Sequence, residues 1–466
     1  MCFGYVLLLS VMRKQALPGS NLFGVYVLFV GCQLIGALMS VLHLPPLFGM
    51  LLVGFTLRNI PGTVLIPDSM MASRLRRLAF GVILLQAGLG MDMEALRKLK
   101  GTALRLAFVP CLVEGIAVGI ACPYILGWPW LYGFMLGFVL GAVSPAVLVP
   151  LMLRLSLRGL GLAKGIPTLV MAASSVDDVL AITIFSLLLA LAFATEEESL
   201  AVTILQGPCE VILGLVLGIV AGIVLWFIPH AKDRYNYVTR WGLLLLCGGV
   251  FIFGSQLVDL PGAGPIGCIT VAFVAVNGWK RRHWIEHESV KQALDVVWFL
   301  VQPFLFGLIG AEIDIDKIHV AVIGRGVVVL IIGLTLRVFA SFLCVGWAGF
   351  SIRERLFIAV AWLPKATVQA ALGPVVLDTA VEAGAGEKKE TIGRDLLTLS
   401  IVSIVLTAPL GAVLVSLTGP RLLQPVTQPP EEPLEDLPPV QTKLIDSELS
   451  GNENIAEPTS PSSDSV

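Results

Sequence analysis

Two adjacent carboxylates, Asp177 and Asp178, lie in the middle of a long apolar segment, within SSVDDVLAI. On insertion scales, placing one carboxylate at the centre of a membrane helix costs about 2.5–3.5 kcal/mol of free energy, so two carboxylates in succession need a physical explanation. A structural salt bridge would account for one of them, but neighbours in a helix point about 100° apart and need separate partners. Na⁺ and Li⁺ prefer oxygen ligands, and burial disfavours the charged carboxylate, so the same oxygens can hold a cation or a proton. The pair predicts a binding site for Na⁺ or Li⁺ at which protons compete.

A proline interrupts the apolar segment GAVSPAVLVP (141–150). Pro145 leaves the carbonyl of Gly141, four residues earlier, without its helical donor. Carbonyls freed in this way are tolerated at membrane depth only where they line a cavity. We therefore expect an unwound stretch whose backbone lies near the ion, formed by Ala142, Val143, Ser144 and Pro145. The alternative is a proline kink that serves only helix packing.

A second segment of the same kind, WLPKATVQAALG (362–373), is broken at Pro364. The ends of two half-helices carry opposite partial charges that cations and carboxylates can use. Lys365 directly follows the break, and we interpret it as charge compensation, either for these helix ends or as a counter-ion to Asp177.

Glu114 and Arg337 each stand alone in the middle of an apolar segment. Either charge alone would be costly in a membrane, so we expect a structural ion pair between them. Arginine does not release its proton at ordinary pH, so Arg337 is not expected to carry the transported proton.

An internal repeat relates the segments that hold these residues. The stretch GLGMDMEAL (88–96) resembles GLIGAEIDIDKI (307–318), and in both halves a single mid-helix charge and then a proline follow at similar spacing. The loop charges place the two units in opposite orientation. We predict inverted repeats around 77–194 and 289–417, the usual construction of secondary transporters, with the site near the midplane.

The composition agrees with a membrane location. Of the 466 residues 56% are hydrophobic and 14% are charged, whereas a soluble domain carries about 25% charged residues. The net charge of −2 and the absence of a basic run argue against nucleic acid as a partner. The cysteines have no CxxC spacing and no enzyme motif stands out, so we predict no cofactor and no enzymatic activity.

The apolar runs predict an all-α polytopic membrane protein with thirteen spans and a partial N-terminal one. The expected ranges are 1–12 (partial), 21–42, 46–58, 77–91, 102–122, 130–153, 166–194, 202–228, 238–258, 264–279, 289–311, 320–348, 355–377 and 394–417. Lys and Arg gather in every second loop, which places those loops and the C-terminus in the cytosol. Three arginines before residue 78, Arg74, Arg76 and Arg77, are an exception, because they precede a helix on the outer side.

Three domains follow from these runs: a partial apolar segment at 1–20, a transmembrane domain at 21–417 and a disordered acidic cytosolic tail at 418–466. The tail is rich in proline and carboxylates and cannot bury a core. Its terminal Val466 is compatible with a protein that captures C-terminal carboxylates, although three residues identify no particular partner.

A glycine motif near residue 262 matches the dinucleotide fingerprint GxGxxG but has no strand before it. Gly262, Gly264 and Gly267 enter an apolar span, so we interpret them as small residues that allow helices to pack closely.

These segments together resemble the cation/proton antiporter superfamily, and specifically the sodium/proton antiporters of the animal NHA branch. The resemblance rests on LGAVSPAVLVP, MAASSVDDVLAITIF, QPFLFGLIGAE and AWLPKATVQAALG, spread over most of residues 17–423. NHA proteins begin with a polar cytosolic segment and a complete first helix that contributes to the dimer, whereas this chain starts within an apolar run.

The resemblance implies a homodimer in which a core domain with crossed broken helices moves like an elevator against a dimerisation domain. It implies that Asp178 is the principal carboxylate for cation and proton, with Asp177 beside it. The combination of Arg337 and Glu114 resembles the NHA pattern and implies electroneutral exchange. The default location is the plasma membrane, and relatives also occur in intracellular and sperm flagellar membranes.

Two other functions remain open from the residues alone. A sodium-coupled symporter of an organic solute would need polar residues around a larger cavity. A membrane scaffold that recruits partners through its tail would have no use for so many midplane charges.

Overall fold

The computed structural model describes residues 2–425 except 43, 61–66, 91–92, 194–199, 229–235, 259, 261, 282–286 and 316–319. Asp92 of the first repeat, Asp259, the acidic residues 196–198 and the tail from residue 426 lie outside the described residues. The described part of the chain is helical and contains only one isolated β-bridge, between Leu160 and Pro425.

The first half of the chain forms α1 to α8, with short 3₁₀ turns between some of them. Their bounds are α1 Cys2–Met12, η1 Arg13–Ala16, α2 Asn21–Val41, α3 Pro46–Asn59, α4 Ser69–Gly90, α5 Met93–Ile125, α6 Trp130–Gly141, α7 Pro145–Leu157, η2 Leu162–Lys164 and α8 Ile166–Phe193.

The second half forms α9 to α18 and includes one π-helical turn, η3. Their bounds are α9 Leu200–Phe227, α10 Asn236–Gly249, η3 Val250–Gly254, α11 Ser255–Leu257, α12 Ala263–Arg281, α13 His287–Ala311, α14 Val320–Cys344, α15 Ile352–Ala361, α16 Thr367–Leu372, α17 Val375–Glu382 and α18 Glu387–Leu422.

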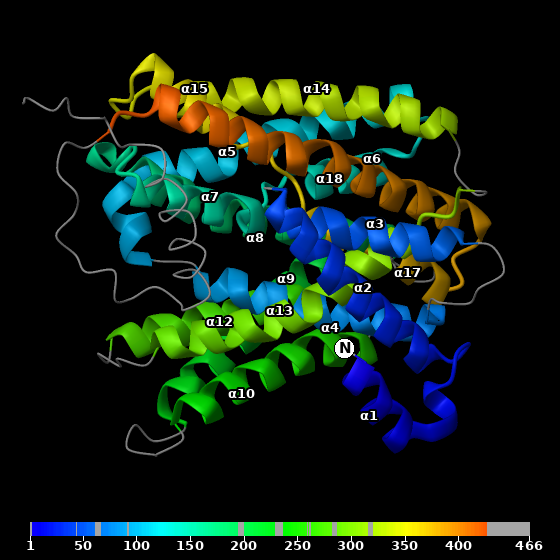
Figure 1. Cartoon of the computed structure of the whole chain (residues 1–466). Coiled ribbons are helices and arrows are strands. Elements are labelled where there is room, and N and C mark those ends of the chain that lie inside the picture. Colours follow the sequence, from blue (N-terminus) through cyan, green and yellow to red (C-terminus); the bar gives the residue numbers. More distant parts are fainter. Residues whose placement is uncertain are drawn as a thin grey trace, which may run out of the picture. The chain divides into compact units, whose positions relative to one another are not determined.

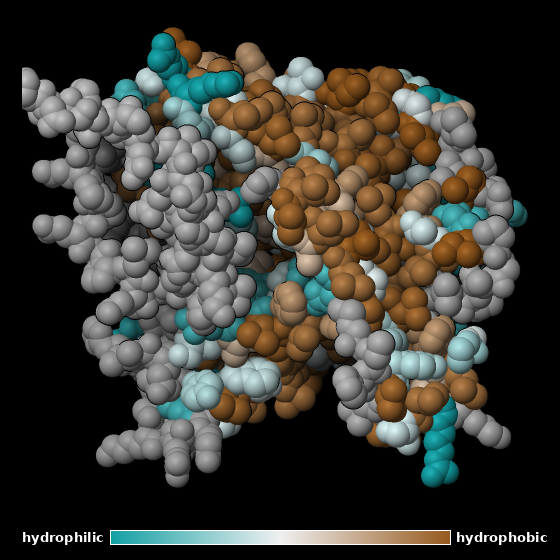
Figure 2. Space-filling model, viewed as in Figure 1, coloured by the Kyte–Doolittle hydropathy of each residue, from teal (hydrophilic) through white to brown (hydrophobic). Residues whose placement is uncertain are grey.

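Nine stretches among the described residues are long and apolar enough to cross a membrane. Large hydrophobic side chains such as Val220 on α9 and Phe339 on α14 point outward, and Figure 2 shows hydrophobic side chains over much of the visible face. Backbone groups in hydrocarbon must be satisfied within the helix, which explains why the described chain is almost entirely helical. The protein is a multi-pass membrane protein.

Much of the helix packing falls into two groups, which contact each other where α8 meets α4, α9 and α12. In one, α5 packs against α6, α8 and α14, while α7 packs against α8 and α15 against α18. In the other, α12 packs against α4 and α9, and α13 packs against α3 and α4. The two groups can be followed in Figure 1, where α14 and α18 run together and α12 lies beside α10. The first group holds all the charged residues of the predicted site.

Most helix bounds agree with the apolar runs, and the largest disagreements are at α5, which begins at Met93, nine residues before the expected start at 102, and at α4. The helix α4 begins at Ser69, eight residues before the expected start at 77, so Arg74, Arg76 and Arg77 lie within it. Arg76 is 4% exposed, because carboxylates distant in the sequence surround it. The sequence had suggested that the three arginines form a charged loop, but they belong to α4.

The turn before α8 is joined to α15 by polar contacts. Ser351 and Glu354 form a capping box at the start of α15, and Lys164 Nζ lies 2.7 Å from Glu354 Oε2. Burial by itself would raise the pKa of Glu354, but the bonds from Lys164 and Ser351 outweigh it and hold that pKa below its ordinary value.

The glycines of the GxGxxG sequence lie at the start of α12. A side chain at Gly264 or Gly267 would meet Phe251 of η3, and there is no strand before them in the described chain. This placement agrees with their interpretation as packing residues.

Candidate ion-binding site

Asp177 and Asp178 lie in the middle of α8, which is continuous through them. Asp177 is fully buried and Asp178 is 4% exposed. The apolar residues of α8 pack against α5, α6 and α7, so the helix carries both carboxylates into the first group of helices.

Both predicted helix breaks are present, and they meet. The helix α6 ends at Gly141 and α7 begins at Pro145, while α15 ends at Ala361 and α16 begins at Thr367. Ser144 N donates to the carbonyl of Pro364 over 2.9 Å, which joins one unwound stretch to the other. The predicted backbone residues 142–144 therefore lie directly against the second break.

The side-chain hydroxyls around the breaks add further contacts. Ser144 Oγ lies 3.4 Å from Thr367 Oγ1, and Lys365 N donates to Thr407 Oγ1 over 3.1 Å. Neither Thr367 nor Thr407 stands out in the sequence, and Thr407 lies in α18, where no local pattern distinguishes it.

Asp177 is held through one of its two carboxylate oxygens. Its Oδ2 accepts a hydrogen bond of 2.7 Å from Val143 N in the first unwound stretch and one of 3.0 Å from Arg337 Nη2. Its Oδ1 is buried and has no hydrogen-bond partner. Asp177 is thus fixed to the broken helix while one oxygen stays available.

Asp178 differs from its neighbour. Its Oδ1 is buried without a hydrogen-bond partner, and no ion pair involves it among the described residues. A buried carboxylate without a partner is costly unless it binds a proton or a cation. This makes Asp178 the position in the site where a bound ion would relieve the largest electrostatic penalty.

Glu114 and Arg337 form the expected ion pair, with 2.8 Å between Oε2 and Nη1 and no exposure of either side chain. The pair is not separate from the carboxylates of α8, however, because the same guanidinium also reaches Asp177. Arg337 in addition donates to the carbonyl of Trp362 over 2.8 Å and to that of Gly141. The planar guanidinium of Arg337, which has five N–H donors, thereby binds both broken helices and two carboxylates.

Lys365 contacts Glu114 instead of Asp177. Its Nζ lies 2.8 Å from both carboxylate oxygens of Glu114 and also donates to the carbonyl of Leu140. The expectation of a counter-ion to Asp177 is not met, because Arg337 occupies that place. The contact with Leu140, at the carbonyl end of α6, fits the other expectation, compensation of a helix end.

The carbonyl end of α6 is satisfied by side chains from α14, from α16 and from the unwound stretch before α16. Lys365 Nζ donates to the carbonyl of Leu140, and Arg337 Nη1 donates to that of Gly141. Gln369 Nε2 donates to the carbonyls of Val139 and Ala142 over 2.8 and 2.9 Å. Gln369 was not identified from the sequence; it lies in the first turn of α16, shortly after the unwound stretch that holds Lys365.

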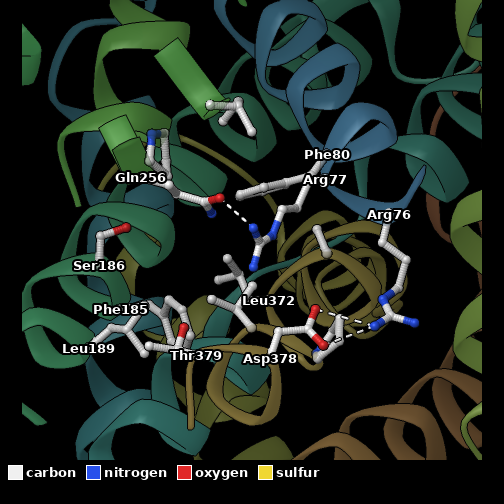
Figure 3. Close-up of a pocket in the computed structure, with 15 residues that line it drawn as sticks. Arg76, Arg77, Phe80, Phe185, Ser186, Leu189, Gln256, Leu372, Asp378 and Thr379 are labelled. Atoms are coloured by element: carbon white, nitrogen blue, oxygen red, sulfur yellow. Dashed lines mark hydrogen bonds and ion pairs between the residues drawn. The ribbon is translucent and has the colours of Figure 1, made fainter. Parts of the chain in front are cut away.

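A cavity lies between α4, α8, α16 and α17, at the border of the two groups of helices (Figure 3). Arg76 lies 2.7 Å from Glu312 and 2.9 Å from Asp378, whereas Arg77 pairs with Glu382 at 2.7 Å and also contacts Gln256. The cavity is distinct from the carboxylates of α8, and its charges are largely paired.

A multi-span bundle with two touching helix breaks and buried carboxylates beside them has the construction of a secondary transporter. Residues 24–418 match the family model described as "Sodium/hydrogen exchanger, transmembrane". The chain belongs to this sodium/hydrogen exchanger family.

Individual relatives of the chain are also sodium/hydrogen exchangers by name. The chain is 44% identical over 439 residues to sodium/hydrogen exchanger 9B2 of Mus musculus, covering 91% of this chain and 78% of the relative. It is 39% identical over 425 residues to sodium/hydrogen exchanger 9B1 of Homo sapiens, covering 89% and 80%. The fold is similar to that of the sodium proton antiporter MjNhaP1 from Methanocaldococcus jannaschii, with a TM-score of 0.69, 18% identity and coverage of 86% of this chain and 98% of that one.

Proposed function

We propose that the chain exchanges Na⁺ or Li⁺ for H⁺ across a membrane, with Asp178 holding the cation and the proton in turn. The observation that carries this proposal is the buried, unpartnered Oδ1 of Asp178, together with an unpartnered oxygen on the adjacent residue Asp177. Hard monovalent cations prefer such oxygens, and a proton satisfies them equally well. Membership of the sodium/hydrogen exchanger family supports the same activity.

The charges of the site favour electroneutral exchange. With every group ionised, Asp177, Asp178 and Glu114 oppose Arg337 and Lys365, so one negative charge remains uncompensated. A single proton or a single monovalent cation brings the buried cluster to neutrality. A buried cluster is most stable when its charges balance, so each occupant should enter alone and exclude the other.

The mechanism that we infer is alternating access by an elevator-like movement of one group of helices against the other, in a homodimer. The inverted-repeat arrangement with thirteen spans, the cytosolic C-terminus and a location in the plasma membrane belong to this proposal. The two groups of helices, with the site in the first, are the parts that such a movement would displace relative to each other.

The proposal is tested by reconstitution into proteoliposomes, where an imposed Na⁺ or Li⁺ gradient should drive a pH change in the lumen. Asp178→Asn should abolish the response, whereas Asp314→Asn, the same chemical change in the partly exposed pair with Arg58, should leave it intact. A wild-type protein that moves no protons, or an active Asp178→Asn variant, would contradict the proposal. An imposed membrane potential that drives exchange by itself would refute electroneutrality.

A further inference from the structure

We propose that Gln369 is a positioning residue for the exchange reaction, acting on Asp177 through the Ala142–Val143 peptide group. In this role its amide orients and polarises that peptide, whose N–H binds Asp177, and so adjusts the competition between cation and proton. This inference rests on the proposed function and assigns a part in it to a residue outside the charged cluster.

The amide of Gln369 is oriented without ambiguity. Gln369 is 1% exposed, and its Nε2 donates both protons, to Val139 O over 2.8 Å and to Ala142 O over 2.9 Å. Reversing the amide would place its oxygen against two carbonyl oxygens, so the network itself assigns the nitrogen to this position.

The hydrogen bonds continue through one peptide group to the ion site. The carbonyl of Ala142 and the N–H of Val143 belong to the same peptide, and that N–H donates to Asp177 Oδ2 over 2.7 Å. A donor at the carbonyl polarises the peptide and strengthens its N–H as a donor on the opposite side. Gln369, the peptide and Asp177 therefore form a continuous hydrogen-bonded chain, to which Arg337 also binds at the same carboxylate oxygen.

The peptide needs this support because it lies outside both half-helices. Ala142 adopts extended backbone angles, φ −84° and ψ 143°, which turn its carbonyl away from the axis of α6. Gln369 holds the carbonyl of Ala142 and Asp177 holds the N–H of Val143, so the Gln369 amide helps to set the direction of this peptide and of its N–H.

Two further observations favour a tuning role over simple packing. The Oε1 of Gln369 is buried without a hydrogen-bond partner, a penalty that an apolar side chain of the same length would avoid. Gln369 is also the only neutral donor among the three side chains that satisfy residues 139–142, the others being Lys365 and Arg337. It can strengthen the peptide donor without altering the charge balance of the site.

The test compares Gln369→Met with wild type in proteoliposomes, measuring the half-saturating Na⁺ concentration and the maximal rate at several pH values. A backbone N–H donor favours the ionised carboxylate, so its weakening should favour the proton over Na⁺. We expect the half-saturating Na⁺ concentration to rise about tenfold and the pH of half-maximal transport to move upward by about one unit. Gln33→Met, which removes a glutamine donor to Phe299 O at a distant place, should leave both values unchanged.

A second variant covers the case in which Gln369→Met does not fold. Glu at position 369 keeps the shape and one donor when protonated, but presents two oxygens to Val139 and Ala142 when ionised. The activity of Gln369→Glu, measured together with ²²Na⁺ binding to the purified protein, should therefore fall relative to wild type as the pH rises.

Wild-type half-saturation and pH dependence in the folded Gln369 variants, with only the maximal rate reduced, would overturn the inference and leave a packing role. That result would leave the proposed function unaffected. The proposed function fails only if the wild-type protein shows no cation-driven proton movement, or if Asp178→Asn retains this movement.

Discussion

Removing the carboxylate of Glu114 should both destabilise the protein and disturb the charge balance of the site. Glu114 accepts charged hydrogen bonds of 2.8 Å from Arg337 and from Lys365, and none of the three side chains is exposed. Bonds to charged groups contribute about 1.5–3 kcal/mol each, and breaking a buried pair by removing one partner costs about 3–5 kcal/mol. Because Gln keeps the shape and one acceptor, we expect Glu114→Gln to lower the free energy of unfolding by about 3 kcal/mol, the lower end of that range.

The same substitution should weaken Na⁺ binding. Without Glu114, Asp177 and Asp178 are balanced by Arg337 and Lys365, so no negative charge remains for a cation to neutralise. Adding Lys365→Met removes one cation and restores the single net negative charge. We therefore expect the double variant to recover a large part of the Na⁺ affinity relative to Glu114→Gln alone. It should also recover part of the stability, because no buried ammonium group is left without its carboxylate.

The assay combines thermal unfolding of the purified proteins with Na⁺-driven proton transport in proteoliposomes, for both single variants, the double variant and wild type. Residues in direct contact are expected to show a coupling energy of about 0.5–3 kcal/mol in such a cycle. If the double variant is as unstable as the sum of the single losses, or binds Na⁺ no better than Glu114→Gln, the charge-balance argument is refuted.

Three other outcomes are expected. Arg76→Met, which removes a buried guanidinium from the partly exposed Glu312 and Asp378, should lower unfolding stability by about 1.5–3 kcal/mol, against about 0–1 kcal/mol for Arg58→Met at a more exposed pair; equal losses in thermal unfolding would show that burial of the arginine does not set the size of the loss. Glu354 has a lowered pKa, so its contact with Lys164 should stabilise the fold at neutral pH and lose this effect as the pH falls through that pKa; the difference in unfolding temperature between wild type and Glu354→Gln should shrink on acidification, and a constant difference would argue against this pairing. Protons and Na⁺ should compete, so the half-saturating Na⁺ concentration should rise about tenfold per pH unit at acidic pH, and a purely lower maximal rate would speak against a shared site.

The helices themselves were largely predictable because long apolar runs leave few alternatives in a membrane. The expected segments 21–42 and 166–194 match α2 and α8 to within one residue. The start of α4 was missed because three nearby arginines suggested a loop. Arg76 is buried against Glu312 and Asp378, and Arg77 pairs with Glu382. These partners lie more than 200 residues away, and no local pattern identifies them.

The two helix breaks were predictable only in combination with their surroundings. Proline alone does not break these helices, since Pro110, Pro303 and Pro409 lie inside continuous ones. At Pro145 the preceding small residues permit unwinding, and distant donors satisfy the freed carbonyls.

The choice of partners within the site could not be read from residue types. Carboxylates and cations at membrane depth indicated that ion pairs must form, and Glu114 with Arg337 was expected. The sharing of Arg337 with Asp177 and the contact of Lys365 with Glu114 depend on how α5, α8, α14 and the second break are arranged in space. Gln369 carries no charge and therefore gave no electrostatic signal at all.

One Na⁺ and one H⁺ should exclude each other at Asp178, and the proton released when Na⁺ binds measures this exclusion. Purified protein at a pH where the site is protonated should release close to one H⁺ for each Na⁺ bound, measured by calorimetric titration in buffers of different ionisation enthalpy. Asp178→Asn should bind Na⁺ weakly and release none. Na⁺ binding without proton release in wild type, or unchanged release in Asp178→Asn, would contradict the account.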